Sequence, residues 1–185
     1  MRNVLRSVSV SLRPSDFWHT PREAVTAEFL AQLPALPFTF AEPCCGEGHL
    51  IRHITDLSHG RCTMQSDLPV DARHITDFGD ADMIITNPPF MSSTLVPMVC
   101  NFIRSGKPAW LLLSSDFAFR SRSGYMMPYC SMIVAIGQIR WIEGSASEGK
   151  KNFAWYKFVG RKCKTQFIHR IPGYRRDHVP ADFLS

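Results

Sequence analysis

The residues of this chain best suited to chemistry are Asn87-Pro88-Pro89-Phe90, which directly follow a short apolar run. Two consecutive prolines hold φ near about −65° and remove two amide donors, so this turn is stiff and its carbonyls have few local partners. The Asn87 side-chain oxygen and a main-chain carbonyl can both accept hydrogen bonds from one amino group, while Phe90 offers a ring face on which a flipped base can stack. The tetrapeptide therefore favours chemistry on a planar amine, although its residues are also ordinary turn formers.

Polar side chains also follow the strand-like runs that precede this turn. The runs and the side chains after them are 38–40 with Glu42, 62–65 with Asp67, 74–76 with Asp77, and 82–86 with Asn87. Because the carboxyl ends of parallel strands face one crevice, we expect these four side chains to surround one site.

The loop after the first of these runs contains Gly46 and Gly48, which allow a backbone to approach a ligand closely at the start of a helix. Asp67 lies 19 residues beyond Gly48, at the end of the next strand, where a carboxylate can bind two ribose hydroxyls. Asp77 stands where it could accept a hydrogen bond from an adenine amino group. The pattern indicates a ligand that contains a nucleoside. A dinucleotide-dependent enzyme is disfavoured, because Ile51 occupies the position of the third glycine in G-x-G-x-x-G.

Strand-like runs alternate with helix-length stretches, which predicts an α/β domain with a largely parallel sheet. The expected helices are 21–30, with Thr20 as the N-cap, 49–57, 96–103 and a short one at 116–122, and a further strand is expected at 110–113. In the last third, the strand-like runs 132–136, 138–142 and 153–159 have no room for crossover helices between them, and a short strand is expected at 166–171. The sheet should therefore finish with an antiparallel pair.

The length of 185 residues predicts a single domain spanning 1–185, with residues 1–14 as a flexible basic extension. No apolar run approaches the roughly 18 residues needed to span a bilayer. The six cysteines include no C-x-x-C pair, which favours reduced thiols and a cytoplasmic protein that does not associate with membranes. His49 and His53 have a metal-compatible spacing, but no third ligand accompanies them, so no metal site is expected.

The net charge of +5 is unevenly distributed. Residues 140–178 contain ten Lys or Arg and three acidic residues, which gives this part +7 and the rest of the chain −2. Aromatic residues lie between these cations, as in surfaces where cations contact phosphates and rings contact bases. A solvated basic sheet edge would have the same composition, so both interpretations stay open.

Taken together and in this order, the motifs resemble those of the S-adenosylmethionine-dependent N6-adenine DNA methyltransferases, particularly the small forms of phages and prophages. The matching segments are 16–21 (D-x-Y-x-T-P in the family, here with Trp18 for Tyr), 42–48 (D-P-x-C-G-x-G), 77–78 (D-F), 87–90 ([DNS]-P-P-[YFW]) and the late loop 144–153. The resemblance implies a Rossmann-like class I methyltransferase fold, with a mostly parallel sheet and an antiparallel C-terminal pair.

The same resemblance implies roles for individual residues. Catalysis falls to Asn87, Pro88, Pro89 and Phe90; S-adenosylmethionine binding falls to Trp18, Thr20, Glu42, Pro43, Cys44, Gly46, Gly48, Asp67, Asp77 and Phe78; and DNA binding falls to Phe90, Lys150, Lys151 and Phe153. The adenine N6 lone pair is delocalised, and two acceptors that hold its hydrogens would direct it toward the methyl group. Neither a strong base nor a metal is required.

One departure and several alternatives remain. Methyltransferases of this family that have a dedicated target-recognition domain are longer than this chain. Recognition of the DNA sequence would therefore lie in loops such as 91–93, 119–128 and 145–151, or the protein has lost its sequence specificity. RNA (adenine N6 or guanine N2) is an alternative substrate, and a glutamine side chain is a weaker one. Cytosine N4 is less compatible with Asn87, and cytosine C5 chemistry would need a nucleophilic cysteine, whereas Cys44 lies in the cofactor loop. A non-catalytic nucleic-acid-binding module with a degenerate fold is the remaining alternative.

Overall fold

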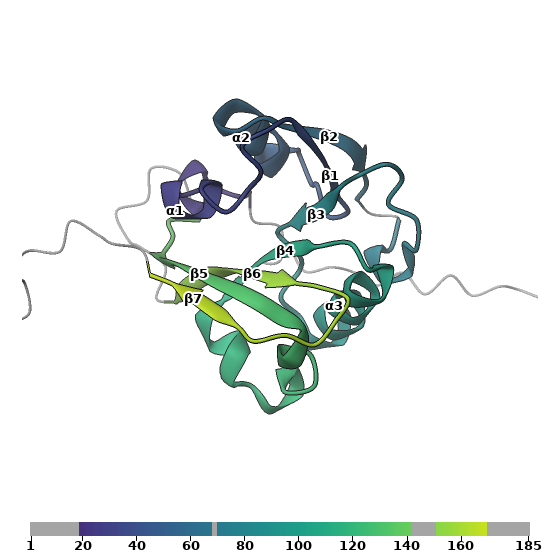
Figure 1. The fold of residues 1–185 in the computed structure, drawn as a ribbon, viewed down its shortest axis with the longest axis vertical. Helices are drawn as coiled ribbons and strands as arrows, with labels where there is room; N and C mark the ends of the chain where they lie inside the picture. Colours follow the sequence, from purple (N-terminus) through teal and green to yellow (C-terminus); the bar gives the residue numbers. More distant parts are fainter. Residues whose placement is uncertain (1–18, 68–69, 142–150, 170–185) are drawn as a thin grey trace, which may run out of the picture.

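A central sheet organises the part of the chain that the computed structural model describes, residues 19–67, 70–141 and 151–169 (Figure 1). Its seven strands are ordered β2-β1-β3-β4-β6-β5-β7. They span Phe38–Glu42 (β1), Gly60–Gln65 (β2), Met83–Thr86 (β3), Ala109–Ser114 (β4), Cys130–Gln138 (β5), Asn152–Phe158 (β6) and Gln166–Ile168 (β7).

Strands β1 to β4 run parallel to one another. Strand β6 is antiparallel to both of its neighbours, β4 and β5, and β7 is parallel to β5. The expected mostly parallel α/β sheet with an antiparallel C-terminal pair is thus confirmed. The order of the strands brings the ends of β1 and β3 together, which places Glu42 beside Asn87.

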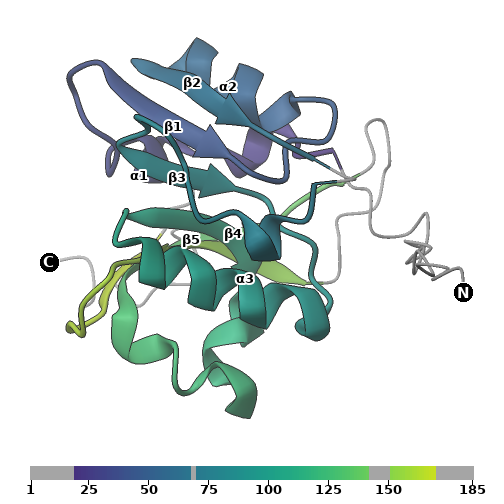
Figure 2. The ribbon, with the colours of Figure 1, turned by 90° about the vertical axis from the view of Figure 1, so that its right-hand side faces the viewer.

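Helices cover both faces of the sheet (Figure 2). Helix α3 (Ser92–Ser105) and the 3₁₀ turns between 115 and 129 lie on one face, and α1 (Ala27–Leu30) and α2 (His49–Leu57) lie on the other. In the part of the chain described, none of the helices is both long and apolar enough to cross a membrane.

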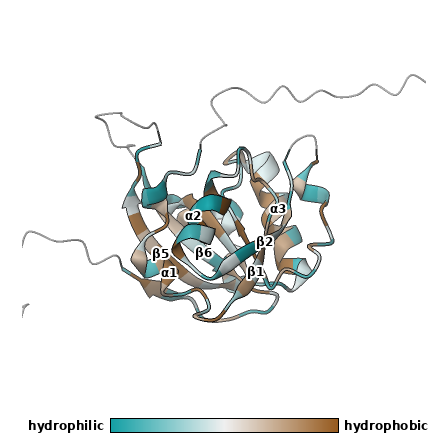
Figure 3. Ribbon diagram, turned by 90° about the horizontal axis from the view of Figure 1, so that it is seen from above, coloured by the Kyte–Doolittle hydropathy of each residue, from teal (hydrophilic) through white to brown (hydrophobic). Residues whose placement is uncertain are grey.

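The core consists of two clusters, one on each face of the sheet. Successive strand residues alternate between them, as the two-residue period of a strand requires: Ile84 and Leu111 belong to the α3 side, whereas Ile85 and Leu112 belong to the α1 and α2 side. The helices carry apolar and polar residues in alternating bands (Figure 3), so each presents only part of its surface to the core.

The N-terminal segment is anchored by aromatic rings. Phe29 of α1 stacks on Trp155 of β6 at 4.2 Å between ring centroids, and the Trp155 indole donates a 2.8 Å hydrogen bond to the Ala24 carbonyl. An aromatic pair of this kind contributes about 1 kcal/mol beyond its buried area. This anchor fixes the chain just downstream of His19 and Thr20.

The expected single helix over 21–30 is wrong. A 3₁₀ turn covers Arg22–Ala24, and α1 then begins after Thr26, which is extended and whose hydroxyl accepts from the Phe29 amide. Thr26 is a good N-cap and competes with a continuous helix. Thr20, the expected N-cap, uses its hydroxyl elsewhere.

Three further expectations were wrong. No strand forms at 74–76, because Asp71 caps a 3₁₀ turn over Ala72–His74. The runs 132–136 and 138–142 are not two strands: β5 continues through Gly137, whose φ of +82° lies at a bulge in the pairing. The short helix at 116–122 is instead two 3₁₀ turns, Ser115–Phe119 and Ser121–Ser123.

Candidate active site

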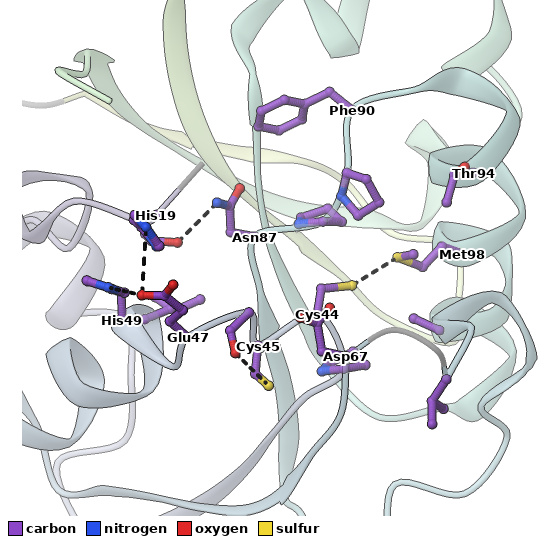
Figure 4. A pocket seen from close by; sticks show the side chains of 18 of the residues that line it. His19, Cys44, Cys45, Glu47, His49, Asp67, Asn87, Phe90, Thr94 and Met98 are labelled. Atoms are coloured by element: carbon purple, nitrogen blue, oxygen red, sulfur yellow. Dashed lines mark hydrogen bonds and ion pairs between the residues drawn. The ribbon is translucent and has the colours of Figure 1, made fainter. Parts of the chain in front are cut away.

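A cavity of about 440 Å³ lies where β1, β2 and β3 end (Figure 4). Its walls come from five parts of the chain: 19–20 before α1, 43–50 after β1, Asp67 and 70–72 after β2, 87–90 after β3, and one face of the first turns of α3. The carboxyl ends of the parallel strands therefore form one site, as the positions of Glu42, Asp67 and Asn87 indicated. Such a crevice is where ligands bind in open parallel sheets.

Asn87 is held in one orientation. Its side-chain nitrogen donates a 3.0 Å hydrogen bond to the hydroxyl of Thr20, a residue that is 5% exposed. Its side-chain oxygen is buried and has no hydrogen-bond partner. In Figure 4 this oxygen lies on the side of the amide nearer Phe90. The site thus presents an oriented acceptor with nothing bound to it among the described residues.

Glu42 lies beneath the cavity wall and is fully buried. Its Oε1 accepts from the Cys44 amide at 2.9 Å and from the Thr86 hydroxyl at 2.6 Å, while its Oε2 has no hydrogen-bond partner. Burial raises the pKa of Glu42 from 4.5 to about 8, against the opposing effect of the Thr86 hydrogen bond. One carboxyl group thus ties the loop after β1 to the residue that precedes Asn87.

The loop after β1 depends on two glycines with positive φ, Gly46 at +48° and Gly48 at +76°. Gly48 is the N-cap of α2, and its amide donates to the Cys45 carbonyl at 2.8 Å. A Cβ at Gly46 would meet no atom within 4 Å, so this glycine is needed for its backbone conformation. Gly46 lines the cavity, and Gly48 shapes the turn behind it.

Cys44 contributes packing to this wall. Its sulfur lies 3.8 Å from the Met98 sulfur, and burial raises the pKa of the thiol well above its ordinary value. A thiol that stays protonated is a poor nucleophile. The geometry agrees with the interpretation that this cysteine is structural.

The carboxylates of the cavity differ from those expected. Asp67 lines it, and so does Asp71, which the sequence analysis missed and which holds Arg73 in a 2.5 Å ion pair. Asp77 instead accepts from the Gly79 amide in an exposed turn, and Phe78 is 1% exposed and packs edge-to-face against a helix α3 ring. Neither Asp77 nor Phe78 reaches the cavity.

Phe90 belongs to a cluster of three rings. Its centroid lies 6.0 Å from that of Trp141 and 5.8 Å from that of Phe153, and the latter two lie 5.0 Å apart. Phe153 is 5% exposed, so it supports the other rings and offers little free surface. Trp141 was not among the expected site residues, because only the fold brings it beside Phe90.

Of the remaining expected residues, Thr20, Pro43, Pro88 and Pro89 line the cavity. Lys151 is exposed just before β6, whereas Trp18 and Lys150 lie outside the described residues. Cavity residues that sequence reasoning did not assign are His19, Cys45, Glu47, His49, Leu50, Val70, Asp71, Ala72, Thr94 and Met98. Most of them neighbour an assigned motif, but no local pattern marks them.

Four basic residues of the described last third lie at opposite ends of the strands. Lys151 lies near the end that carries the cavity, because Phe153 pairs with Ser114 at the end of β4. Arg161, Lys162 and Lys164 follow Phe158, which pairs with Ala109 at the start of β4. These three cations therefore lie at the opposite end from the cavity.

No protein-family model matches the sequence, and no curated protein is significantly similar to it. Three solved structures have a similar fold. A candidate RNA methyltransferase of Pyrococcus horikoshii is 12% identical, with 79% of this chain and 87% of that chain covered and a TM-score of 0.54. The modification subunit of a candidate type I restriction enzyme of Vibrio vulnificus is 16% identical, with 88% and 49% covered and a TM-score of 0.55.

The third, a candidate class I S-adenosylmethionine-dependent methyltransferase of Listeria monocytogenes, is 10% identical, with 95% and 72% covered and a TM-score of 0.52. This chain spans about half the length of the Vibrio protein. The chain thus has the Rossmann-like fold of the class I methyltransferases, and at these identities the similarity concerns the fold alone.

Proposed function

We propose that this protein transfers a methyl group from S-adenosylmethionine to the exocyclic N6 amine of adenine in DNA. The observation that carries this proposal is the Asn87 side-chain oxygen, which is buried, oriented by Thr20 and without a partner. A buried acceptor left unsatisfied costs about 1–3 kcal/mol. A ligand that donates a hydrogen bond to the Asn87 oxygen would remove this unfavourable free energy.

The cavity residues fit the cofactor that the fold family uses. Asp67, at the end of β2, is placed to accept hydrogen bonds from ribose hydroxyls, and the Gly46 turn exposes backbone at the N-terminal end of α2. S-adenosylmethionine supplies an electrophilic methyl group on a sulfonium. Because Asp77 and Phe78 lie away from the cavity, adenine contacts on this side would come from the 70–72 segment instead.

Positioning is the main catalytic contribution of the chain. Asn87 accepts one hydrogen of the amine, and the Pro88 carbonyl accepts the other, so both hydrogens are held out of the plane of the base and the lone pair is localised on the nitrogen. The N–C bond would then form as the methyl–sulfur bond breaks, with S-adenosylhomocysteine as the leaving group. The two prolines keep these acceptors rigid. Phe90 stacks on the base, with Trp141 and Phe153 supporting its ring. The extra proton leaves the methylated nitrogen for solvent, so no strong base is needed.

RNA is the second candidate substrate, because the same acceptors would hold an adenine or guanine amino group in RNA. Asn87, Pro88 and Phe90 would contact the base and not the sugar, so they do not distinguish deoxyribose from ribose. We therefore keep this substrate as an alternative in the test.

The test is transfer of a labelled methyl group to purified DNA, total RNA and ribosomes, each compared with the Asn87→Ala variant. Label in DNA that depends on Asn87 supports the proposal, and digestion to nucleosides then identifies the methylated position. Label in RNA alone would replace DNA by RNA. If no substrate is labelled although the cofactor binds, a non-catalytic module is favoured.

A further inference from the structure

Three side chains from two segments converge at the cavity wall: His19 from before α1, and Glu47 and His49 from the loop after β1 and the start of α2 (Figure 4). The Glu47 Oε2 atom lies 3.8 Å from the His19 Nε2 and 3.6 Å from the His49 Nε2. One ligand atom from each of the three side chains lies within 4.8 Å of the other two. The two imidazole rings are 4.4 Å apart between centroids. These groups approach one another closely without forming hydrogen bonds.

Two of the three separations approach those of ligands around one ion. Zn²⁺ binds imidazole nitrogen and carboxylate oxygen at about 2.0–2.2 Å, so two ligands of a tetrahedral ion lie roughly 3.3–3.5 Å apart. The separations of 3.6 Å from Glu47 to His49 and 3.8 Å from Glu47 to His19 exceed this by only a few tenths of an ångström. The side chains are 56%, 73% and 32% exposed for His19, Glu47 and His49, which leaves them free to make this small adjustment.

The backbone that carries these ligands is held in place. The Thr20 carbonyl, next to His19, accepts a 3.1 Å hydrogen bond from His53, and the Glu47 carbonyl accepts a 2.8 Å bond from Arg52. His49 is the first residue of α2, directly after the positive-φ Gly48. Binding would therefore order only side chains, because the backbone is already fixed.

We propose that His19, Glu47 and His49 bind one divalent transition-metal ion, for which Zn²⁺ is the best match. Two imidazoles and one carboxylate are a common zinc ligand set that leaves a coordination position for water or another ligand. No metal site was expected from the spacing of His49 and His53, because the sequence offers no third ligand beside them. In the fold, His53 is engaged with Thr20, and His19 and Glu47 lie beside His49. The ion joins the 19–20 segment to the loop after β1. The inference does not rest on the proposed function, because binding of the ion is measured without methyl transfer.

The test is binding of Zn²⁺ to the metal-free full chain, followed by calorimetry and by the rise in Tm. We expect one ion bound per chain, with an affinity that falls at least tenfold in His49→Ala and in His19→Ala. The matched control is His59→Ala, because His59 is exposed and lies at the far end of α2 from the site. Circular dichroism and the Tm of each metal-free variant establish that it is folded.

The free cysteines are the main competing ligands for zinc, and Cys45 is the one nearest this loop. Cys45→Ser should bind Zn²⁺ as the wild type does, and Co²⁺ bound at the site should give a spectrum without a thiolate charge-transfer band. Equal affinity in the wild type and His49→Ala would overturn the proposal. Loss of the site in Cys45→Ser, or in His59→Ala, would overturn it equally.

Discussion

Strands β1 and β3 are parallel neighbours in the sheet, yet the contacts at their two ends differ. Where they begin, Thr39 and Asp82 satisfy each other: the Asp82 carboxylate accepts from the Thr39 amide at 2.7 Å and from its hydroxyl at 2.9 Å. Where they end, Glu42 Oε2 and Asn87 Oδ1 are the two buried side-chain oxygens of the described residues that have no partner.

This difference separates stability from function within one pair of strands. At the amino ends of β1 and β3, the polar groups are paired by the Thr39–Asp82 contacts and by Lys107, which donates a 2.6 Å hydrogen bond to the Ala81 carbonyl. At the carboxyl ends of these strands, the two buried oxygens of Glu42 and Asn87 have no hydrogen-bond partner. This is unfavourable unless a ligand donates hydrogen bonds to them. Substitutions at the amino ends should therefore change stability, and substitutions at the carboxyl ends should change activity.

The largest expected effect is that of Asn87→Ala. Removing the oriented acceptor should lower kcat for methyl transfer by about 10²–10³-fold, the range found when one preorganised transition-state hydrogen bond is deleted. Cofactor affinity, measured by calorimetry, should stay within twofold. The Tm should fall only slightly, because the variant loses one hydrogen bond to Thr20, worth about 1 kcal/mol, while it also removes a buried oxygen that has no partner. Retained activity would remove Asn87 from the mechanism.

The next effect concerns pH and Glu42. Because the folded-state pKa of Glu42 is raised from 4.5 to about 8, folding favours its protonated form. Below about pH 4.5 the carboxyl is protonated whether the chain is folded or not. As the pH rises toward 8 the unfolded chain ionises and the wild type loses stability, by an amount on the order of a few kcal/mol.

Glu42→Gln mimics the protonated carboxyl and does not titrate. The variant should therefore gain stability relative to the wild type between pH 5 and pH 8, and the difference should level off above pH 8. Thermal unfolding of both proteins across this range measures it. Parallel stability curves would mean that the pKa of Glu42 is the same in the folded and the unfolded chain.

A smaller effect should follow from Thr20→Val, which keeps the shape of the side chain and deletes the acceptor for the Asn87 amide. Loss of one such hydrogen bond costs about 1 kcal/mol, so kcat should fall roughly five- to tenfold. Thr20→Ser retains the hydroxyl and is the matched control. If Thr20→Val raises only the KM for the cofactor, Thr20 contacts the cofactor and does not orient Asn87.

The smallest effect is expected at the amino ends of β1 and β3. Asp82→Ala removes the acceptor of both Thr39 bonds and should lower the Tm by about 3 °C, with kcat and KM unchanged. The comparison with Asn87→Ala is direct, since both residues flank β3. A loss of activity in Asp82→Ala at a temperature where the variant is folded would show that the two ends of these strands are coupled.

Much of the fold was predictable because its signals are local. Helix α2 matches its expected range, 49–57, since a glycine turn precedes it and Leu50 and Ile54 form an apolar face. The strands β1 to β4 were expected within a few residues of their bounds. The expected strand at 74–76 failed because the side chain of one residue, Asp71, favours a capped turn over extension.

The site was predictable where a motif carries its own geometry. Asn87 and Asp67 were found because they end strands, and a parallel sheet gathers such ends. The hydrogen bond from Asn87 to Thr20 joins residues 67 positions apart, and no pattern in either segment predicts it. The same holds for Trp141 beside Phe90 and for His19 beside Glu47, whose proximity arises only from the tertiary fold.

The Glu42 carboxyl makes the two loops of the site energetically dependent on each other. One oxygen accepts from the Cys44 amide in the loop after β1 and from Thr86, the residue before Asn87. A ligand that displaces either loop changes a bond shared with the other. By thermodynamic linkage, any increase in affinity that a first ligand confers on a second is returned by the same factor. The shared carboxyl thus provides a physical route to cooperative binding at the two halves of the cavity.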